Sequence, residues 1–172
     1  MTTSHPGTAK LSACGVYRHE LTRMLDARNP RVLVVCGLNP STATADVDDA
    51  TIRKELKYAQ RWGCGLLVKV NAYDFRATQP TELLRAAKRG AVISSADNDA
   101  DIRDAVARAQ ARGSVILAAW GRNIRPDRQA EVARLLGRRA VCLGTNQDGS
   151  PVHPLYQKDD ATPIGWRLPD VS

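Results

Sequence analysis

One short stretch limits the folds open to this chain more than any other. Residues 32–36 form an apolar, largely β-branched run, VLVVC, which stops at Gly37 and is followed by the polar loop Asn39-Pro40-Ser41. An apolar run of this length, closed by turn formers, is typical of a strand buried on both faces, as in parallel sheets. In open α/β sheets, ligands bind beside the carboxyl ends of such strands. We therefore predict a strand that delivers a ligand-binding loop, with an ordinary turn as the alternative.

Further apolar runs alternate with segments of helical periodicity along the chain. Strands are predicted over 32–36, 66–70, 115–120 and 140–143. Helices are predicted over 50–62, 78–90, 97–112 and from Pro126 or Asp127 to Leu136, with a shorter one from about Tyr17 to Leu25. Everything after Gly144 is expected to be loop. Alternation of this kind predicts an α/β fold whose central four-stranded parallel sheet is covered by helices on both faces.

The chain length suits one domain. Its 172 residues are enough to bury a core without staples, so we expect a single α/β domain over 11–172 and a disordered tail over 1–10, which is rich in Thr, Ser, Pro and Gly. No apolar run approaches the roughly 20 residues that a membrane span needs, and the N-terminus lacks the apolar segment of a signal peptide. We therefore expect no membrane partner and a cytoplasmic location.

The charge balance favours an anionic partner. A formal net charge of +7 and a pI near 9.6 suit DNA or a nucleotide. Arginines cluster around the last predicted helix, where they suit either phosphate contacts or a solvated helix face: Arg122, Arg125, Arg128, Arg134, Arg138 and Arg139.

Known cofactor motifs are missing from the sequence. The four cysteines form no C-x-x-C pair, and three of them lie in or beside apolar stretches, which favours reduced core cysteines over a zinc site or a disulfide. The glycine-rich dinucleotide and P-loop motifs, the H-E-x-x-H zinc motif and the G-x-S-x-G nucleophile elbow do not occur. We therefore expect no cofactor and no metal.

Polar residues follow each predicted strand. Besides the loop after the first strand, they include Asn71, Asp74 and Arg76 after the second, Arg122 and Asn123 in the segment Trp120-Gly121-Arg122-Asn123 that ends the third, and His153 after the fourth. Because parallel strands end at the same edge of a sheet, we expect these residues to converge on one crevice. A pocket of amides with one imidazole suits hydrogen bonding to the edge of a planar base, where the imidazole donates to an oxygen that gains negative charge.

Short motifs connect the chain with two known families. It resembles a small bacterial and phage family of unknown function, numbered 1643, through CGVYR, LNPSTA, DDATIR, AQRWG, VNAYDFRAT, the Asn98-Asp99 pair, AAWG and HPLY. It is more distantly similar to the uracil-DNA glycosylase superfamily, nearest to the mismatch-specific branch, through GLNPS, VNAYDFRATQPTEL, ILAAWGRN and HPLY. The second resemblance implies a three-layer α/β/α sandwich of the uracil-DNA glycosylase type.

The glycosylase resemblance also implies roles for single residues. Asn39 would orient a water toward the anomeric carbon, Asn71 would hydrogen-bond the base, and His153 would stabilise the negative charge of the departing base. Substrate contacts are expected from Gly37, Leu38, Pro40, Ser41, Asn71, Tyr73, Arg76, Trp120, Gly121, Leu155 and Tyr156.

The sequence departs from the glycosylase pattern at the general base. The first motif lacks the water-activating aspartate of the uracil-specific branch, and an asparagine cannot take a proton from water at neutral pH. Asp46, Asp48 and Asp49 leave the same edge of the sheet, so one of them, with Asp49 as our candidate, can supply the base, while one caps the next helix. Leu155 and Tyr156 would wedge into a duplex as the base leaves, or else cover the core as a lid.

Together these features predict a glycosylase-like protein. It would bind a nucleobase in DNA or in a nucleotide and hydrolyse the N-glycosidic bond. A non-catalytic nucleic-acid binding module and an enzyme acting on a free nucleoside or other small metabolite remain as alternatives, and the sequence leaves the oligomeric state open.

Overall fold

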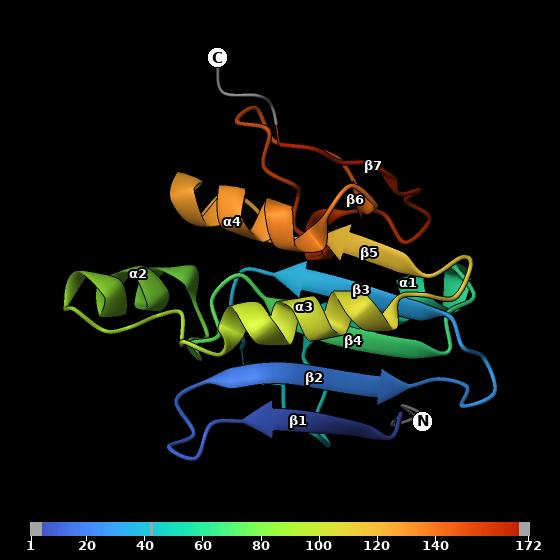
Figure 1. Cartoon of the computed structure of the whole chain (residues 1–172), viewed down its shortest axis with the longest axis horizontal. Coiled ribbons are helices and arrows are strands. Elements are labelled where there is room, and N and C mark those ends of the chain that lie inside the picture. The colour runs from blue at the N-terminus through green and yellow to red at the C-terminus, as the bar shows by residue number, and fades with distance from the viewer. Residues whose placement is uncertain (1–4, 42, 169–172) are drawn as a thin grey trace.

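The computed structural model describes residues 5–41 and 43–168, which form a mixed α/β fold around one sheet (Figure 1). Within these residues the sheet has seven strands in the order β1-β2-β4-β3-β5-β6-β7. The strands are β1 (Gly7–Leu11), β2 (Arg18–Met24), β3 (Val32–Gly37), β4 (Leu66–Asn71), β5 (Val115–Ala118), β6 (Ala140–Cys142) and β7 (Ile164–Gly165). The helices are α1 (Ala50–Arg61), α2 (Pro80–Lys88), α3 (Asn98–Arg108), α4 (Pro126–Leu136) and the short 3-10 helix η1 (Pro154–Tyr156).

The predicted strands form the parallel centre of this sheet. β3 pairs in parallel with β4 and β5, and β5 pairs in parallel with β6. Three antiparallel strands extend this centre, β1 and β2 beyond β4, and β7 beyond β6. The expectation of a four-stranded, wholly parallel sheet is therefore wrong, because the described sheet is mixed and has seven strands.

β2 replaces the helix predicted from Tyr17. Tyr17, Leu21 and Leu25 stand four residues apart, which suits a helix, but the segment hydrogen-bonds to β1 on one side and to β4 on the other. Leu21 is fully buried in the core, and Arg23, two positions along on the same face, is buried too. Pairing with two neighbours therefore overrides the local spacing.

Both ends of the chain hold more structure than the sequence predicts. The predicted disordered tail is wrong from Gly7 onward, since Gly7–Leu11 form β1 and pair with β2, whereas residues 1–4 lie outside the described residues. The predicted loop after Gly144 contains η1 and β7, whose Ile164 pairs with Cys142 of β6. Both added strands are short and largely exposed, so they carry little hydrophobic signal.

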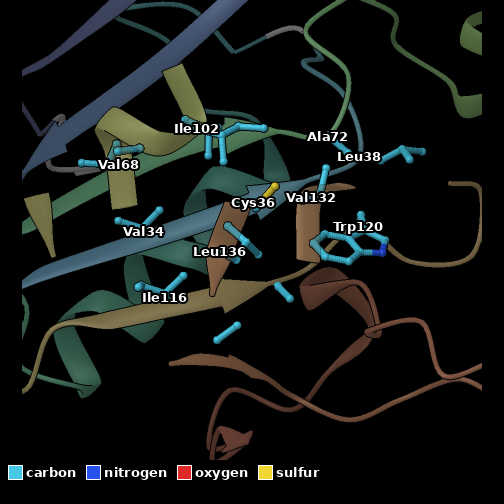
Figure 2. Close-up of a cluster of buried hydrophobic side chains, with 14 of the residues drawn as sticks. Val34, Cys36, Leu38, Val68, Ala72, Ile102, Ile116, Trp120, Val132 and Leu136 are labelled. Carbon is cyan, nitrogen blue, oxygen red and sulfur yellow. The ribbon is translucent and has the colours of Figure 1, made fainter. Parts of the chain in front are cut away.

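Helices cover both faces of the sheet and define two clusters of buried side chains. On one face, Ile102 of α3 and Val132 of α4 pack with Val34 and Ile116 of the sheet (Figure 2). On the other face, the apolar side of α1 packs against the sheet, with Ile52 as one contact. None of the described helices is both long and apolar enough to span a membrane.

Two local predictions are confirmed. Asp49, one of the aspartates expected to include the N-cap, caps α1 by accepting a hydrogen bond from the backbone N–H of Ile52 at 2.9 Å. Cys36, Cys64 and Cys142 are free and buried, while Cys14 is exposed.

Candidate functional site

A cavity of about 540 Å³ lies at the carboxyl ends of the parallel strands. Its walls come from the last residues of β3 and β4, the loop after β5, the first turn of α1 and the segment that contains η1. This volume lies in the range of sites for small ligands, roughly 300–1,000 Å³.

The cavity brings together most of the predicted site residues. Those that line it are Gly37, Leu38, Asn39, Ser41, Asp49, Asn71, Trp120, Gly121, His153, Leu155 and Tyr156. They span 120 positions of sequence, from 37 to 156, and meet because β3, β4 and β5 run parallel and end at one edge.

Three predicted site residues lie outside the cavity walls. Pro40 is buried within the loop that follows β3. The Tyr73 hydroxyl accepts a hydrogen bond from the backbone N–H of Arg125 at 3.1 Å, and the side chain is buried in the core. The Arg76 guanidinium donates to the carbonyl of Gly15 at 3.1 Å, toward the β1–β2 connection. These residues therefore support the loops around the cavity.

Asn71 lines the cavity, and the polar atoms of its side chain are unpaired within the part of the chain that the structure describes. It is the last residue of β4 and is 1% exposed. Neither its Oδ1 nor its Nδ2 has a hydrogen-bond partner among the described residues. A buried polar group left without a partner costs about 1–3 kcal/mol, so such groups are rare and call for an explanation. A ligand in the cavity would complete these hydrogen bonds.

Gly37 gives the Asn71 side chain its room. The two residues are opposite each other in the β3–β4 register. A β-carbon on Gly37 would stand 2.9 Å from Asn71 Oδ1 and 2.8 Å from Lys69 Nζ. Because real β-carbons essentially never come that close, only glycine fits here without displacing either side chain.

Lys69 and Glu55 form a buried ion pair beside the cavity, which Lys69 lines. Their side chains are 5% and 0% exposed. Burial raises the pKa of Glu55, and the Lys69 ammonium acts in the opposite direction. Sequence analysis missed both residues, although a lysine inside the apolar run LLVKVN and a glutamate on the buried side of α1 carry the signal.

Arg18 is a second cation of the cavity wall. It is 2% exposed, and its Nη1 donates to the carbonyl of Ala43 at 2.5 Å, while Nε has no partner among the described residues. Burial lowers the pKa of Arg18 to about 10, which still leaves the guanidinium charged at neutral pH. The residue escaped sequence analysis because its segment was assigned to a helix.

His153 is held in one tautomer. Its Nδ1 accepts a hydrogen bond from the backbone N–H of Leu155 at 3.2 Å, so the neutral ring carries its proton on Nε2. Burial, aided by the charge of Lys69, lowers the pKa of His153 to about 4. At neutral pH the ring is therefore an uncharged hydrogen-bond donor.

Asn39 holds its own loop. Its Nδ2 donates to the carbonyl of Pro40 at 3.0 Å and to that of Ala77 at 2.8 Å. The predicted alternative, a structural role in the turn, is thus part of what the residue does. Its Oδ1 is left as the hydrogen-bond acceptor at the cavity wall.

The three aspartates considered as general bases occupy different surroundings. Asp49 lines the cavity, where its charge raises the pKa of both His153 and Arg18 against the stronger effect of burial. Asp48 is paired with Arg23 at 2.7 Å, and Asp46 is exposed on the loop away from the cavity wall. Of the three aspartates, Asp49 is the one that lines the cavity.

The mouth of the cavity is apolar on one side and basic on another. Leu155 is 40% exposed and Tyr156 81% exposed, and Arg122 also lines the cavity. Arg128, by contrast, is buried and paired with Asp99 at 2.7 Å, so not all of the arginine cluster is available to a ligand. In the part of the chain that the structure describes, no group of three or more His, Cys, Asp or Glu residues is arranged to hold a metal ion.

A family model supports one of the two resemblances. The model described as "Protein of unknown function (DUF1643)" matches residues 18–155. The chain belongs to this family. The region matched by the DUF1643 model begins at Arg18 and ends at Leu155, both of which line the cavity. The chain matches no curated protein and no solved structure.

Proposed function

We propose that this DUF1643 protein binds a nucleobase in the cavity and hydrolyses the N-glycosidic bond that joins the base to its sugar. The Asn71 amide carries the proposal, because it offers a free donor and a free acceptor side by side on a buried wall. A base edge has the complementary pattern, and enzymes that act on bases hydrogen-bond that edge in this way. The similarity of GLNPS and HPLY to motifs of the uracil-DNA glycosylase superfamily supports the same assignment.

His153 stabilises the leaving base. As the glycosidic bond breaks, the bonding electrons move onto the base, and one of its oxygens gains negative charge. The Nε2–H of the neutral His153 ring donates to that oxygen, as the donors of an oxyanion hole do. Because Nδ1 is already engaged by the Leu155 N–H, the donor keeps a fixed direction throughout the reaction.

Asn39 and Asp49 serve the attacking water. Asn39 Oδ1 accepts a hydrogen bond from the water, and the Asp49 carboxylate takes the proton as the water oxygen bonds to the anomeric carbon. The proton then passes to the base, which leaves as the neutral free base, and the sugar keeps the hydroxyl. Positioned acids and bases of this kind contribute roughly 10²–10⁴-fold to a rate.

Residues at the mouth of the cavity suit a base that is first flipped out of the base stack of a duplex. The exposed side chains of Leu155 and Tyr156 can fill the gap that an extruded base leaves in a duplex. Arg122, which also lines the cavity, can contact phosphate. The base can therefore be carried by DNA or by a nucleotide.

The test measures release of free base. Single-stranded and duplex oligonucleotides, and the corresponding nucleotides and nucleosides, containing uracil, thymine, cytosine, adenine, guanine or hypoxanthine are incubated with the full chain and analysed by liquid chromatography. We expect release from at least one member, and Asp49→Asn should slow it by 100-fold or more while preserving the cap oxygen of α1. Asp46→Asn, in the same loop but away from the cavity, is the matched control. Asn71→Ala should weaken binding of the same substrate.

The remaining outcomes separate the alternatives. Salt-sensitive DNA binding without release, unchanged in Asp49→Asn, would identify a binding module that lacks the chemistry. Release from a free nucleoside at a rate insensitive to salt would identify an enzyme of small metabolites. Absence of binding to every base-containing molecule would refute the proposal.

A further inference from the structure

Arg18 is an exception among the buried cations of this chain. Each buried lysine or arginine other than Arg18 in residues 5–41 and 43–168 has a carboxylate partner. The pairs are Lys69–Glu55, Arg23–Asp48 and Arg128–Asp99. No carboxylate oxygen of the described residues lies within 4 Å of the Arg18 guanidinium, although the residue is only 2% exposed. Removing a charge from water without a counter-charge is strongly unfavourable, so buried charges are ordinarily paired.

The acidic residues nearest to Arg18 are already engaged. Asp49 and Glu55 both attract the guanidinium from a distance. Asp49, however, caps α1 through the Ile52 N–H, and Glu55 holds Lys69. The protein therefore supplies Arg18 with one carbonyl, that of Ala43, and no close counter-ion.

The cavity provides the place for the missing partner. Arg18 lines it together with Asn71, whose amide is also without a partner. A guanidinium is a rigid, planar donor that matches the paired oxygens of a carboxylate or phosphate. Two unsatisfied side chains from different strands, one charged and one neutral, thus face the same space.

We propose that Arg18 binds a terminal anionic group of the ligand, a phosphate monoester or a carboxylate. This inference rests on the proposed function for its second half: the ligand is then a nucleoside that carries the acidic group, such as a nucleoside monophosphate, and its base meets Asn71 while its anionic group meets Arg18. A phosphodiester inside a DNA chain fits less well, because the strand continues on both sides of the phosphate and Arg18 is only 2% exposed.

The first experiment tests the anion site without any base. Thermal unfolding of the full chain is followed in phosphate, in acetate and in sodium chloride of equal ionic strength, for wild type, Arg18→Met and Arg18→Lys. We expect phosphate or acetate to raise the Tm of wild type above its value in chloride, and the rise to disappear in Arg18→Met and persist in part in Arg18→Lys. Arg28→Met, whose parent side chain is 94% exposed, is the control and should behave as wild type.

The variant also has a signature in the absence of ligand. Arg18→Met removes a buried unpaired charge at similar side-chain length, so its Tm in chloride should equal or exceed that of wild type. A purely structural arginine, held for its bond to Ala43, would instead give a lower Tm. If Arg18→Met does not fold, the wild-type comparison of phosphate and acetate with chloride still decides, because no Tm rise in either anion would overturn the proposal.

The second experiment tests whether the anionic group and the base belong to one ligand. Calorimetric titration compares each of the four common deoxynucleosides and deoxyuridine with its 5′-monophosphate, and deoxyuridine with 5-carboxy-2′-deoxyuridine. We expect at least tenfold tighter binding of the phosphorylated or the carboxylated form, with the difference abolished in Arg18→Met, and the form that gains affinity identifies the anion. Nucleosides that bind as tightly as their acidic forms would refute the role of Arg18 and leave the base site intact. Arg18-dependent stabilisation by phosphate or acetate, with no binding of any nucleoside or nucleotide, would keep the anion site and refute the proposed function.

Discussion

Replacing Lys69 by methionine tests the buried ion pair at the cavity wall. Glu55 is completely buried, and Lys69 is its ion-pair partner. Removing one partner of such a pair leaves an uncompensated charge and costs about 3–5 kcal/mol of unfolding free energy. Replacing both residues, as in Lys69→Met with Glu55→Leu, exchanges the pair for apolar side chains of similar volume, a change that is often neutral or stabilising. We therefore expect the double variant to be more stable than the single one.

The loss in Lys69→Met should depend on pH. Burial already raises the pKa of Glu55 above its unfolded value of about 4.5, and without the ammonium it rises further. The folded variant then holds a proton that the unfolded chain releases above pH 4.5. Stability is therefore retained at low pH and lost as pH rises toward the folded pKa, by up to roughly 1.4 kcal/mol for each pH unit. The variant should be closer to wild type at pH 5 than at pH 7.

Urea unfolding followed by the fluorescence of the three tryptophans measures these differences. With a urea m-value of roughly 2 kcal/mol per molar, a loss of about 4 kcal/mol lowers the midpoint by about 2 M. The reasoning would be refuted if the double variant were as unstable as Lys69→Met, or if the deficit of Lys69→Met were the same at pH 5 and pH 7.

Other residues give shorter tests. Gly37→Ala places a β-carbon 2.9 Å from Asn71 Oδ1, so urea unfolding should show a loss of about 1–3 kcal/mol and calorimetry weaker base binding. Burial lowers the pKa of His153 to about 4, below its unfolded value of about 6.5. The free energy of unfolding should therefore decrease by up to about 3 kcal/mol as the pH falls from 6.5 to 4. Urea unfolding of His153→Gln should show a smaller decrease over the same pH range. Asp49→Ala should lose about 1 kcal/mol of cap stabilisation in urea unfolding, and Asp49→Asn much less. A thiol reagent should modify Cys14 alone of the four cysteines before unfolding and all four in urea.

Each of these tests has an outcome that contradicts it. Unchanged stability and binding in Gly37→Ala would show that the Asn71 and Lys69 side chains move aside at little cost. Equal pH slopes for wild type and His153→Gln would mean that the ring is not buried as a neutral group. Equal stability of Asp49→Ala and Asp49→Asn would remove the cap, and rapid modification of a second thiol would place a core cysteine near the surface.

The sequence predicts the parallel centre of the fold because its strands are nearly uniform in hydrophobicity. Val32–Cys36 and the other apolar runs need no partner information to be recognised, and the alternation with helices sets their direction. β2 cannot be recognised as an apolar run. Its buried positions include Arg18 and Arg23, whose burial depends on Ala43 and Asp48 from a later loop. Hydrophobic periodicity cannot show a charge that is buried by distant partners.

For the candidate site too, the sequence predicts one part and misses another. Convergence of Asn39, Asn71 and His153 follows from parallel topology alone, so it is predictable from the positions of strand ends. The unpaired state of the Asn71 amide and of Arg18 does not follow from any local pattern, because it is a property of everything that surrounds them. Tyr73 and Arg76 show the opposite error, since residues near a strand end were assigned to the ligand when their partners are backbone groups of neighbouring loops.

The walls of the cavity have a consequence for the order of folding. Arg18 and Tyr156, which both line the cavity, lie far apart in the sequence, so the ligand's surroundings are assembled only when the whole segment between them has taken its place. A growing chain on the ribosome would expose the sheet edge long before it could hold a ligand. A ligand therefore cannot guide the first steps of folding and acts at the end, where its binding stabilises the folded molecule over the unfolded chain.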